Sequence, residues 1–274
     1  TTAKTTTSLT TTPPTTISPA GPQWQLTFED NFNTLNTNTW NIYNDCSTGG
    51  NACAWNNELQ VYLASQVTVA NGTLAIEASN ASYTSRNAGT RQFRSGRMDT
   101  SFSFAQKYGR FEARIKLPVG QGMWPAFWLL PKSTACWPMG GEIDIMENIG
   151  KEPSTLHANY HFGPGCNWNM NAGGSNCGHT GSATTVNFNN DFHLFAVEWT
   201  PTSMRWSVDN AVYYTLSSAG CSWPFFMPDS PMYVVLNLAV GGDWPGNPDA
   251  TTVFPQRMLV DYVRAYKPTI PFRV

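Results

Sequence analysis

The sequence predicts an all-β protein, a one-domain sandwich of antiparallel sheets. Short segments in which apolar and polar residues alternate recur along the chain, as in Phe111–Leu117, and this period is typical of strands that bury one face. Turn-forming residues separate these segments at short intervals, and the chain has 22 glycines and 19 prolines among its 274 residues. We find no apolar stripe of helical period longer than about two turns.

The expected strands follow in chain order from this alternation and from the turn residues that bound each segment. Together they span residues 24–266, and their close spacing favours a sandwich or a barrel. The expected strands are Trp24–Phe28, Glu58–Leu63, Thr73–Ala78, Ser95–Phe104, Gly109–Leu117, Ala126–Leu130, Glu142–Glu147, Leu156–Phe162, His193–Trp199, Met204–Val208, Ala211–Leu216, Met232–Val240 and Met258–Tyr266.

Residues 1–20 differ in composition from the rest of the chain, with ten threonines, two serines and three prolines. Such a segment cannot bury a core, so we interpret it as an extended, O-glycosylated linker to a further N-terminal module. A frayed tail without consequence explains it equally well. Residues 21–274 are then the folded domain. Because the chain begins at Thr1 and carries no signal-like apolar segment, we interpret it as a mature form.

Charge excludes two classes of partner. The net charge is −2 and only 12% of residues are charged, so the chain has no basic surface for nucleic acid or for an anionic membrane. No apolar run approaches the length of a transmembrane span.

Six cysteines indicate an oxidising compartment and predict a secreted protein with up to three disulfides. Short loops favour Cys46–Cys53 and Cys166–Cys177, which would leave Cys136 to pair with Cys221. The sequons Asn71–Thr73 and Asn80–Ser82 predict N-glycosylation in a eukaryotic host.

The stretch Gly141–Glu147 is the most informative part of the chain. It holds three acids within six residues, although the whole chain has only 18. Glu142 and Asp144 alternate with isoleucines and share one strand face, while Glu147 comes one position late. With Met146 out of step, an inserted residue of the kind found in a β-bulge returns Glu147 to the face of the other two acids.

This arrangement fits paired catalytic carboxylates. At a rise of about 3.3 Å per residue, inward-leaning carboxyl groups of Glu142 and Glu147 come within about 5–6 Å, close to the spacing in retaining glycosidases. A solvated face is the usual explanation of an acidic strand. The low charge of the chain and the neighbouring tryptophans favour catalysis instead.

Tryptophans flank the acids in sequence. Trp124 and Trp128 are four residues apart and share a strand face, and flat indole rings suit the apolar faces of pyranose sugars. Two core tryptophans are the alternative. Trp244 lies in a turn-rich segment after an apolar strand, where a cleft position explains it better than a core position.

Two histidines and one alternating segment add candidates. His157 and His161 are four residues apart. No third ligand is apparent for a metal pair, so a hydrogen bond from one of them to substrate or to a carboxylate is favoured. The segment Asn57–Tyr62 alternates polar and aromatic residues, which suits a sugar groove and a solvated face equally. The sequence contains no nucleophile elbow, P-loop, dinucleotide fingerprint or HExxH motif.

Taken together, these segments resemble glycoside hydrolase family 16, and within it the laminarinase-like endo-1,3-β-glucanases. The matching segments run in family order and span most of residues 24–267. They are Asn57–Tyr62, Tyr108–Arg114, Trp124–Pro131, Gly141–Glu147, Asn237–Gly246 and Asp261–Tyr266.

The resemblance implies a β-jelly-roll of two curved antiparallel sheets with a sugar cleft on the concave face. It also implies that Glu142 is the nucleophile, Asp144 its assistant and Glu147 the acid/base. Negative charge on the first two acids is expected to raise the pKa of Glu147. The positions matching the family's cleft are Trp124, Trp128, His161, Trp244, Asn57 and Glu58.

The implied activity is retaining endo-hydrolysis of β-1,3-glucosidic bonds in laminarin-type glucans by a monomer that needs no cofactor. Some members of the family hold a structural calcium ion on the convex side. The matching positions here are Glu29, the backbone of Gly72, and Asp261, whose oxygens suit a hard cation.

Three other activities compete with this interpretation. A mixed-linkage 1,3-1,4-β-glucanase and a galactan hydrolase belong to the same class, but the tryptophan segments favour glucan, and the bulged motif differs from the strict alternation of dedicated lichenases. A non-catalytic β-glucan-binding protein is disfavoured because such proteins typically lose motif glutamates, whereas all three acids are present here.

Overall fold

The computed structural model describes residues 23–45, 55–86, 89–163, 165–166, 180–184, 186–217 and 228–272. Strands dominate these residues, and the only helical element among them is the 3-10 helix η1 (Ala64–Gln66). The predicted linker, residues 1–20, lies outside the described residues. The strands are β1 (Trp24–Asp30), β2 (Asn41–Ile42), β3 (Gln60–Tyr62), β4 (Val67–Ala70), β5 (Thr73–Ala78), β6 (Tyr83–Ser85), β7 (Gly89–Arg91), β8 (Phe93–Ser95), β9 (Arg97–Asp99), β10 (Gly109–Lys116), β11 (Met123–Pro131), β12 (Glu142–Glu147), β13 (Thr155–His161), β14 (Thr180–Thr184), β15 (His193–Trp199), β16 (Ser203–Val208), β17 (Ala211–Ser217), β18 (Met232–Val240) and β19 (Gln256–Pro268).

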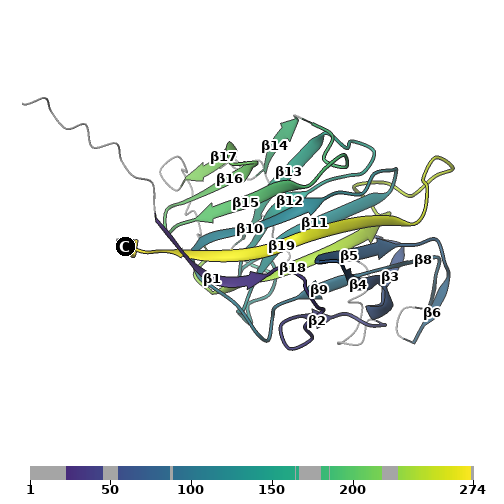
Figure 1. Ribbon diagram of the computed structural model, residues 1–274, viewed down its shortest axis with the longest axis horizontal. Coiled ribbons are helices and arrows are strands. Elements are labelled where there is room, and N and C mark those ends of the chain that lie inside the picture. The colour runs from purple at the N-terminus through teal and green to yellow at the C-terminus, as the bar shows by residue number, and fades with distance from the viewer. Residues whose placement is uncertain are drawn as a thin grey trace, which may run out of the picture.

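Two antiparallel sheets make up most of the molecule, as predicted (Figure 1). The larger has the order β17-β16-β15-β10-β19-β5-β4, and β1 also pairs with β19. The other has the order β14-β13-β12-β11-β18-β9-β2. The remaining pairs are the parallel β3 and β8 and the antiparallel β6 and β7. No helix in the described part of the chain is long and apolar enough to cross a bilayer.

A single large core lies between the two sheets, because alternate residues of each strand point inward. Leu74 and Ile76 of β5 in the larger sheet and Phe127 of β11 in the other are completely buried in the same cluster. Burial of each such side chain contributes about 1.5–3 kcal/mol to stability. The core also carries one polar link, since the indole Nε1 of Trp206 on β16 donates to the carbonyl oxygen of Asp144 on β12 (2.9 Å).

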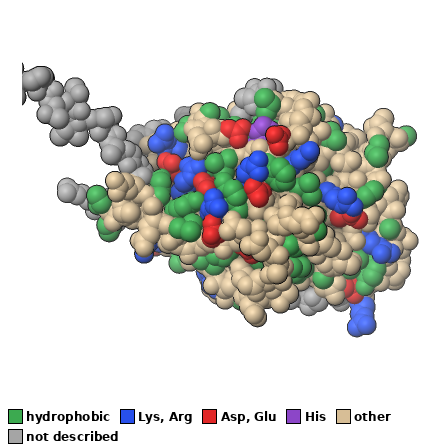
Figure 2. Space-filling view, viewed as in Figure 1, with side chains coloured by type: hydrophobic (Ala, Val, Ile, Leu, Met, Phe, Trp, Pro, Cys, Tyr) green, Lys and Arg blue, Asp and Glu red, His purple; other side chains and the backbone are tan. Residues whose placement is uncertain are grey.

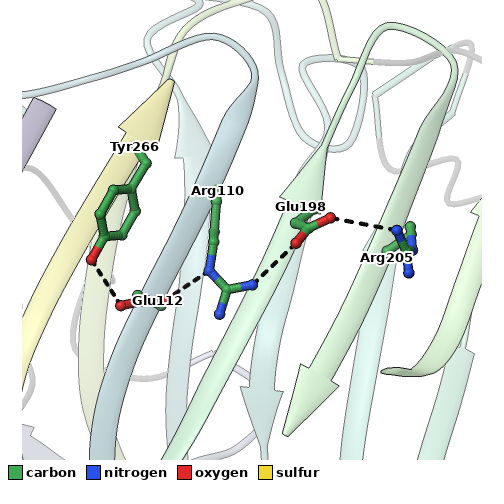
Figure 3. A network of polar contacts seen from close by, with 5 residues as sticks. All are labelled: Arg110, Glu112, Glu198, Arg205 and Tyr266. Atoms are coloured by element: carbon green, nitrogen blue, oxygen red, sulfur yellow. Dashed lines mark hydrogen bonds and ion pairs between the residues drawn. The ribbon is translucent and has the colours of Figure 1, made fainter. Parts of the chain in front are cut away.

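The outward face of the larger sheet is polar. Basic and acidic side chains alternate over it in Figure 2, and the close-up in Figure 3 shows one row of them crossing β19, β10, β15 and β16. The Tyr266 hydroxyl donates to Glu112 (3.0 Å), and Arg110 donates both to Glu112 (2.8 Å) and to Glu198 (3.2 Å). Arg205 pairs with the other oxygen of Glu198 at 3.7 Å.

Two expectations about strands need correction. The predicted strand Ser95–Phe104 ends at Asp99, because the Asp99 carboxylate accepts from the Ser101 backbone N–H (2.9 Å) and the Thr100 hydroxyl donates to the Phe104 carbonyl (2.9 Å), which turns the chain. The strands β2, β4, β6, β7, β8 and β14 were not predicted, because segments of two to five residues are too short to show a clear alternation.

The predicted disulfides are wrong where the structure tests them. Cys136 pairs with Cys166, with 5.3 Å between the Cα atoms, so neither Cys166–Cys177 nor Cys136–Cys221 forms. The reason is the register of β12 and β13: Glu142 lies opposite His161, so the loop before one strand and the loop after the other meet at the same end of the sheet. The predicted Cys46–Cys53 pair lies outside the described residues.

Candidate active site

The acidic strand β12 contains the predicted bulge. On the neighbouring β11, Trp128 lies opposite Asp144 and Phe127 lies opposite Met146, so the residue between them, Ile145, has no partner. Ile145 is therefore the extra residue. Ile145 and Met146 are both buried in the core, at 1% and 0% exposure, and two consecutive inward side chains are the signature of a bulge.

The bulge brings the three acids onto one face. Glu142, Asp144 and Glu147 all line one cavity of about 470 Å³ on the side of the smaller sheet that faces away from the core. The irregular ladder leaves the Asp144 carbonyl free to accept from Trp206 of the facing sheet. The Trp206 indole therefore holds the bulge at the point where the pairing of β12 with β11 becomes irregular.

Two hollows meet at the acids. The second, of about 520 Å³, shares Trp124, Trp137, Glu142 and Glu147 with the first. The first hollow continues toward Glu58, and the second toward His157 and Trp244. A cleft that extends to both sides of the acids suits a chain-like ligand bound across them.

Glu142 and Asp144 lie beside His161 of β13. The His161 Nε2 is 3.0 Å from Asp144 Oδ2 and 3.8 Å from Glu142 Oε1, and the Trp137 indole donates to Glu142 Oε2 (3.0 Å). Burial raises the pKa of Asp144 to about 8. Burial and charge on Asp144 raise the pKa of Glu142 to about 8, while His161 and the Trp137 N–H oppose the rise.

Both oxygens of Glu147 accept hydrogen bonds. The Trp124 indole donates to Oε1 (2.9 Å), and the Asn159 amide donates to Oε2 (2.8 Å). Burial, followed by charge on Asp144, raises the pKa of Glu147 to about 8, as the sequence predicted in direction. Because these acids interact closely, they lose their protons in steps and cannot all be charged at neutral pH.

The predicted tryptophans come together in the cleft. Trp128 lines the first hollow and donates to Asn237 Oδ1 (2.7 Å). Trp124 stands between the hollows, and its ring meets that of Trp244 edge-on at 5.3 Å. Trp244 in turn contacts the His157 ring at 5.0 Å. These rings offer apolar platforms on both sides of the acids.

The segment that begins at Asn57 divides between cleft and rim. Glu58 lines the first hollow at 6% exposure, and burial raises its pKa to about 7. Asn57 lines neither hollow; its amide donates to Asp243 (2.9 Å), and its neighbour Asn56 lines both. Gly242 permits this contact between loops, because a Cβ there would lie 2.8 Å from the Asn56 carbonyl oxygen.

Several cleft residues were not predicted, among them Asn159, Trp137 and Arg97. Asn159 alternates with His157 and His161 on β13, and this period-2 spacing could have revealed it. Trp137 lies in the loop between β11 and β12, where the sequence has no strand or helix periodicity that would predict the direction of its side chain. Arg97 also lines the cleft, with its guanidinium packed between the rings of Tyr43, Trp55 and Trp128 at 4.9–5.0 Å, and only strand pairing brings these rings together.

The predicted calcium ligands are already partnered. Glu29 accepts from Arg264 (2.7 Å) and Asp261 accepts from Arg114 (2.7 Å), while Gly72 lies in the turn between β4 and β5. Calcium prefers several free carboxylate and carbonyl oxygens. With both carboxylates neutralised by arginines, this arrangement does not fit the ion well, and the calcium site stays a prediction.

Residues 54–264 match the glycosyl hydrolases family 16, a span that includes every acid of the cleft. The chain belongs to this family. A β-glucanase of Rhodothermus marinus is 36% identical over 266 residues, which cover 90% of this chain and 86% of that protein. Two of the similar solved structures illustrate the match.

The endo-β-1,3-glucanase of Pyrococcus furiosus has a TM-score of 0.79 at 38% identity and covers 91% of this chain and 96% of its own. The laminarinase catalytic domain of Thermotoga maritima has a TM-score of 0.78 at 36% identity, with 90% and 99% covered. This family 16 chain therefore has the jelly-roll fold that the resemblance implied, and it is a glycoside hydrolase.

Proposed function

We propose that this protein hydrolyses internal β-1,3-glucosidic bonds of laminarin-type β-glucans with retention of anomeric configuration. One observation carries the proposal: Glu142 and Glu147 stand in one cleft, where two hollows meet. The names of the relatives, β-glucanase, endo-β-1,3-glucanase and laminarinase, support β-1,3-glucan as the substrate.

In this mechanism Glu142 attacks the anomeric carbon while Glu147 protonates the leaving oxygen. The bond from the sugar to that oxygen breaks as the bond to the Glu142 carboxylate forms. Asp144 and the Trp137 N–H orient Glu142. Glu147 then takes a proton from water, which attacks the glycosyl ester and frees Glu142.

The electrostatics of the cluster fit this exchange of roles. Burial and charge on Asp144 raise the pKa of Glu147, and Glu142 and Glu147 repel each other when both are charged, so Glu147 keeps its proton while Glu142 is ionised. Esterification of Glu142 removes one negative charge. The pKa of Glu147 then falls, and the group can act as a base.

The cleft shape supports endo action. Trp124 stands at the junction, with Trp128 in the first hollow and Trp244 in the second, so sugar units can stack on both sides of the scissile bond. Asn57, which stands at the rim, contributes through Asp243 rather than by direct lining.

We also propose that the protein is secreted and acts as a monomer on β-glucan without a cofactor. The cystine Cys136–Cys166 supports an oxidising compartment. The exposed turn at Asn71 supports glycosylation of the sequon Asn71–Thr73 in a eukaryotic host.

Sugar release from laminarin, lichenan and agarose, measured side by side, tests the activity. We expect the highest kcat/KM on laminarin, long oligosaccharides among the first products, and the β-anomer as the initial product by NMR. Glu147→Gln should lower kcat about 10²–10⁴-fold, the size of a general-acid contribution. Asp191→Asn, at an exposed acid that lines neither hollow, is the control for the three-acid assignment and should leave kcat unchanged.

Four outcomes would contradict the proposal. An initial α-anomer excludes retention, and a preference for lichenan or agarose excludes the substrate. Folded protein that binds laminarin without releasing sugar would be a glucan-binding protein. Full activity of Glu147→Ala on substrates with poor leaving groups would remove the acid/base assignment.

A further inference from the structure

The loop between β11 and β12, residues 132–141, carries a side chain to the centre of the cleft. Its Trp137 borders both hollows, donates to Glu142 Oε2, and lies with its ring 5.8 Å from the ring of His161. The indole is nevertheless 43% exposed, so packing encloses it only partly.

Among the described residues, few backbone hydrogen bonds hold this loop in place. Within the described residues, the backbone hydrogen bonds of residues 133–141 run inside the loop, from Met139 N–H to the Cys136 carbonyl (2.8 Å) and from Gly141 N–H to the Pro138 carbonyl (2.9 Å). The covalent link from Cys136 to Cys166 ties the residue next to Trp137 to the chain beyond β13.

We propose that the cystine Cys136–Cys166 is a positioning element for catalysis, which holds the Trp137 indole N–H against the Glu142 carboxylate. The geometry supports this role because β13 pairs directly with β12, with His161 opposite Glu142. The cystine thus fixes the middle of the loop, and the pairing of Glu142 with His161 fixes the point where the loop enters β12. The inference rests on the proposed glucanase activity.

The consequence concerns the ionisation of Glu142. This carboxyl faces Asp144 and Glu147 on its own strand, His161 on β13 and the more distant Tyr233 on β18. Against the negative neighbours, the Trp137 N–H favours the charged form that attacks the sugar. Without the cystine the loop relaxes and the indole N–H moves away from the carboxylate, so Glu142 loses a donor that favours its charged form and ionises at higher pH.

A double-mutant cycle tests the proposal. We compare the wild type, Trp137→Phe, the double variant Cys136→Ser/Cys166→Ser and the combined triple variant in kcat/KM on laminarin as a function of pH. Trp137→Phe should lower kcat/KM about 10-fold, the size of one hydrogen bond to a charged group, and should move the acid limb to higher pH. The cystine variant should likewise lower kcat/KM and move the acid limb of the pH profile to higher pH.

The decisive comparison is the triple variant. If the cystine acts through Trp137, then removing the cystine from the Trp137→Phe variant should lower kcat/KM by less than about a further 2-fold. Dividing kcat/KM by the folded fraction measured at each pH corrects the profile for stability, so a poorly folding cystine variant still gives an answer. Thr134→Ala, at an exposed side chain of the same loop, controls for general loosening and should leave the limb in place.

A readout without turnover separates this inference from the proposed activity. The indole N–H resonance of Trp137, assigned by its loss in Trp137→Phe, should follow the titration of Glu142 in the wild type and stop following it once the cystine is removed. An inactive wild type would contradict the glucanase proposal alone. Multiplicative effects in the cycle, or an indole resonance that titrates equally with and without the cystine, would overturn the positioning role.

Discussion

At the scale of residues, Glu142, Asp144 and Glu147 lie together in the cleft, where burial raises the pKa of each to about 8. Groups arranged in this way serve catalysis and destabilise the fold at the pH where the enzyme works. His161 at 3.0 Å from Asp144 and the N–H donors of Trp137 and Trp124 offset part of this cost.

The stability of the protein should therefore depend on pH through Asp144. Its pKa is about 3.9 in the unfolded chain and is raised to about 8 in the fold, so its contribution is fully present below pH 4 and is lost as pH rises toward 8. Asp144→Asn removes this loss. We expect the variant to be more stable than the wild type by about 1–3 kcal/mol at pH 7.5, with a smaller difference at pH 4.5.

Urea unfolding at both pH values measures the effect, and laminarin assays should show a large loss of kcat. Asp191→Asn, at an exposed acid, is the matched control and should change stability little at either pH. An equal difference at pH 4.5 and 7.5 would show that Asp144 does not titrate as its burial requires.

At the scale of elements, the two sheets divide the work. The smaller sheet carries the cleft, while the larger one supplies Trp206 to the bulge and presents its polar rows to solvent (Figure 3). In the row across four strands, Glu112 is the buried member and accepts from both Arg110 and Tyr266. Its contacts therefore contribute to the fold and not to the site.

We expect Glu112→Ala to destabilise the protein by about 2–4 kcal/mol, because it leaves Arg110 with Glu198 as its carboxylate partner and removes the acceptor of the Tyr266 hydroxyl. Arg205→Ala removes an exposed pair at the edge of the same row and should cost less than about 1 kcal/mol. Urea unfolding measures both, and kcat/KM on laminarin should remain that of the wild type. A loss of activity in folded Glu112→Ala would mean that the outward face influences the cleft.

The arginine pairs also lead to a prediction about metal. Since Arg264 and Arg114 neutralise Glu29 and Asp261, we expect removal of calcium with EDTA to move Tm by less than about 1 °C. Scanning calorimetry with and without added calcium chloride measures this. A rise of several degrees with calcium that disappears in Asp261→Asn would establish the structural ion that the resemblance implied.

At the scale of the whole molecule, the described fold begins close to the predicted domain boundary. β1 starts at Trp24, and the Gln23 carbonyl accepts from the Thr269 backbone N–H (2.8 Å), which closes the larger sheet near both ends of the described chain (Figure 1). Deletion of residues 1–20 removes none of these contacts.

We therefore expect the deletion variant to keep the Tm and the kcat/KM of the wild type on soluble laminarin, because a segment of this Thr/Ser/Pro-rich composition is not expected to bury a core. Calorimetry and a reducing-sugar assay check this, with deletion of residues 1–30, which removes β1, as the destabilised comparison. A lower Tm on removal of residues 1–20 alone would mean that the segment packs on the domain and is not a linker.

Much of the site was predictable because strand patterns are local. The period-2 alternation of Gly141–Glu147 reveals both the shared face of the acids and the inserted residue, and the spacing of Trp124 and Trp128 places them together. The sequence could not say which residue is extra. The bulge falls on Ile145 because Met146 keeps its partner on β11, and only the paired strand decides this.

By itself, then, the sequence determined the sandwich, the three acids and the tryptophan-lined character of the cleft, since each follows from the order of side chains along one strand. The tertiary structure alone decided the Cys136–Cys166 pair, the contact of Trp137 with Glu142, and the arginines that occupy Glu29 and Asp261. These depend on which strands become neighbours and in which register. Register is set by packing of the whole core, and no single segment contains that information.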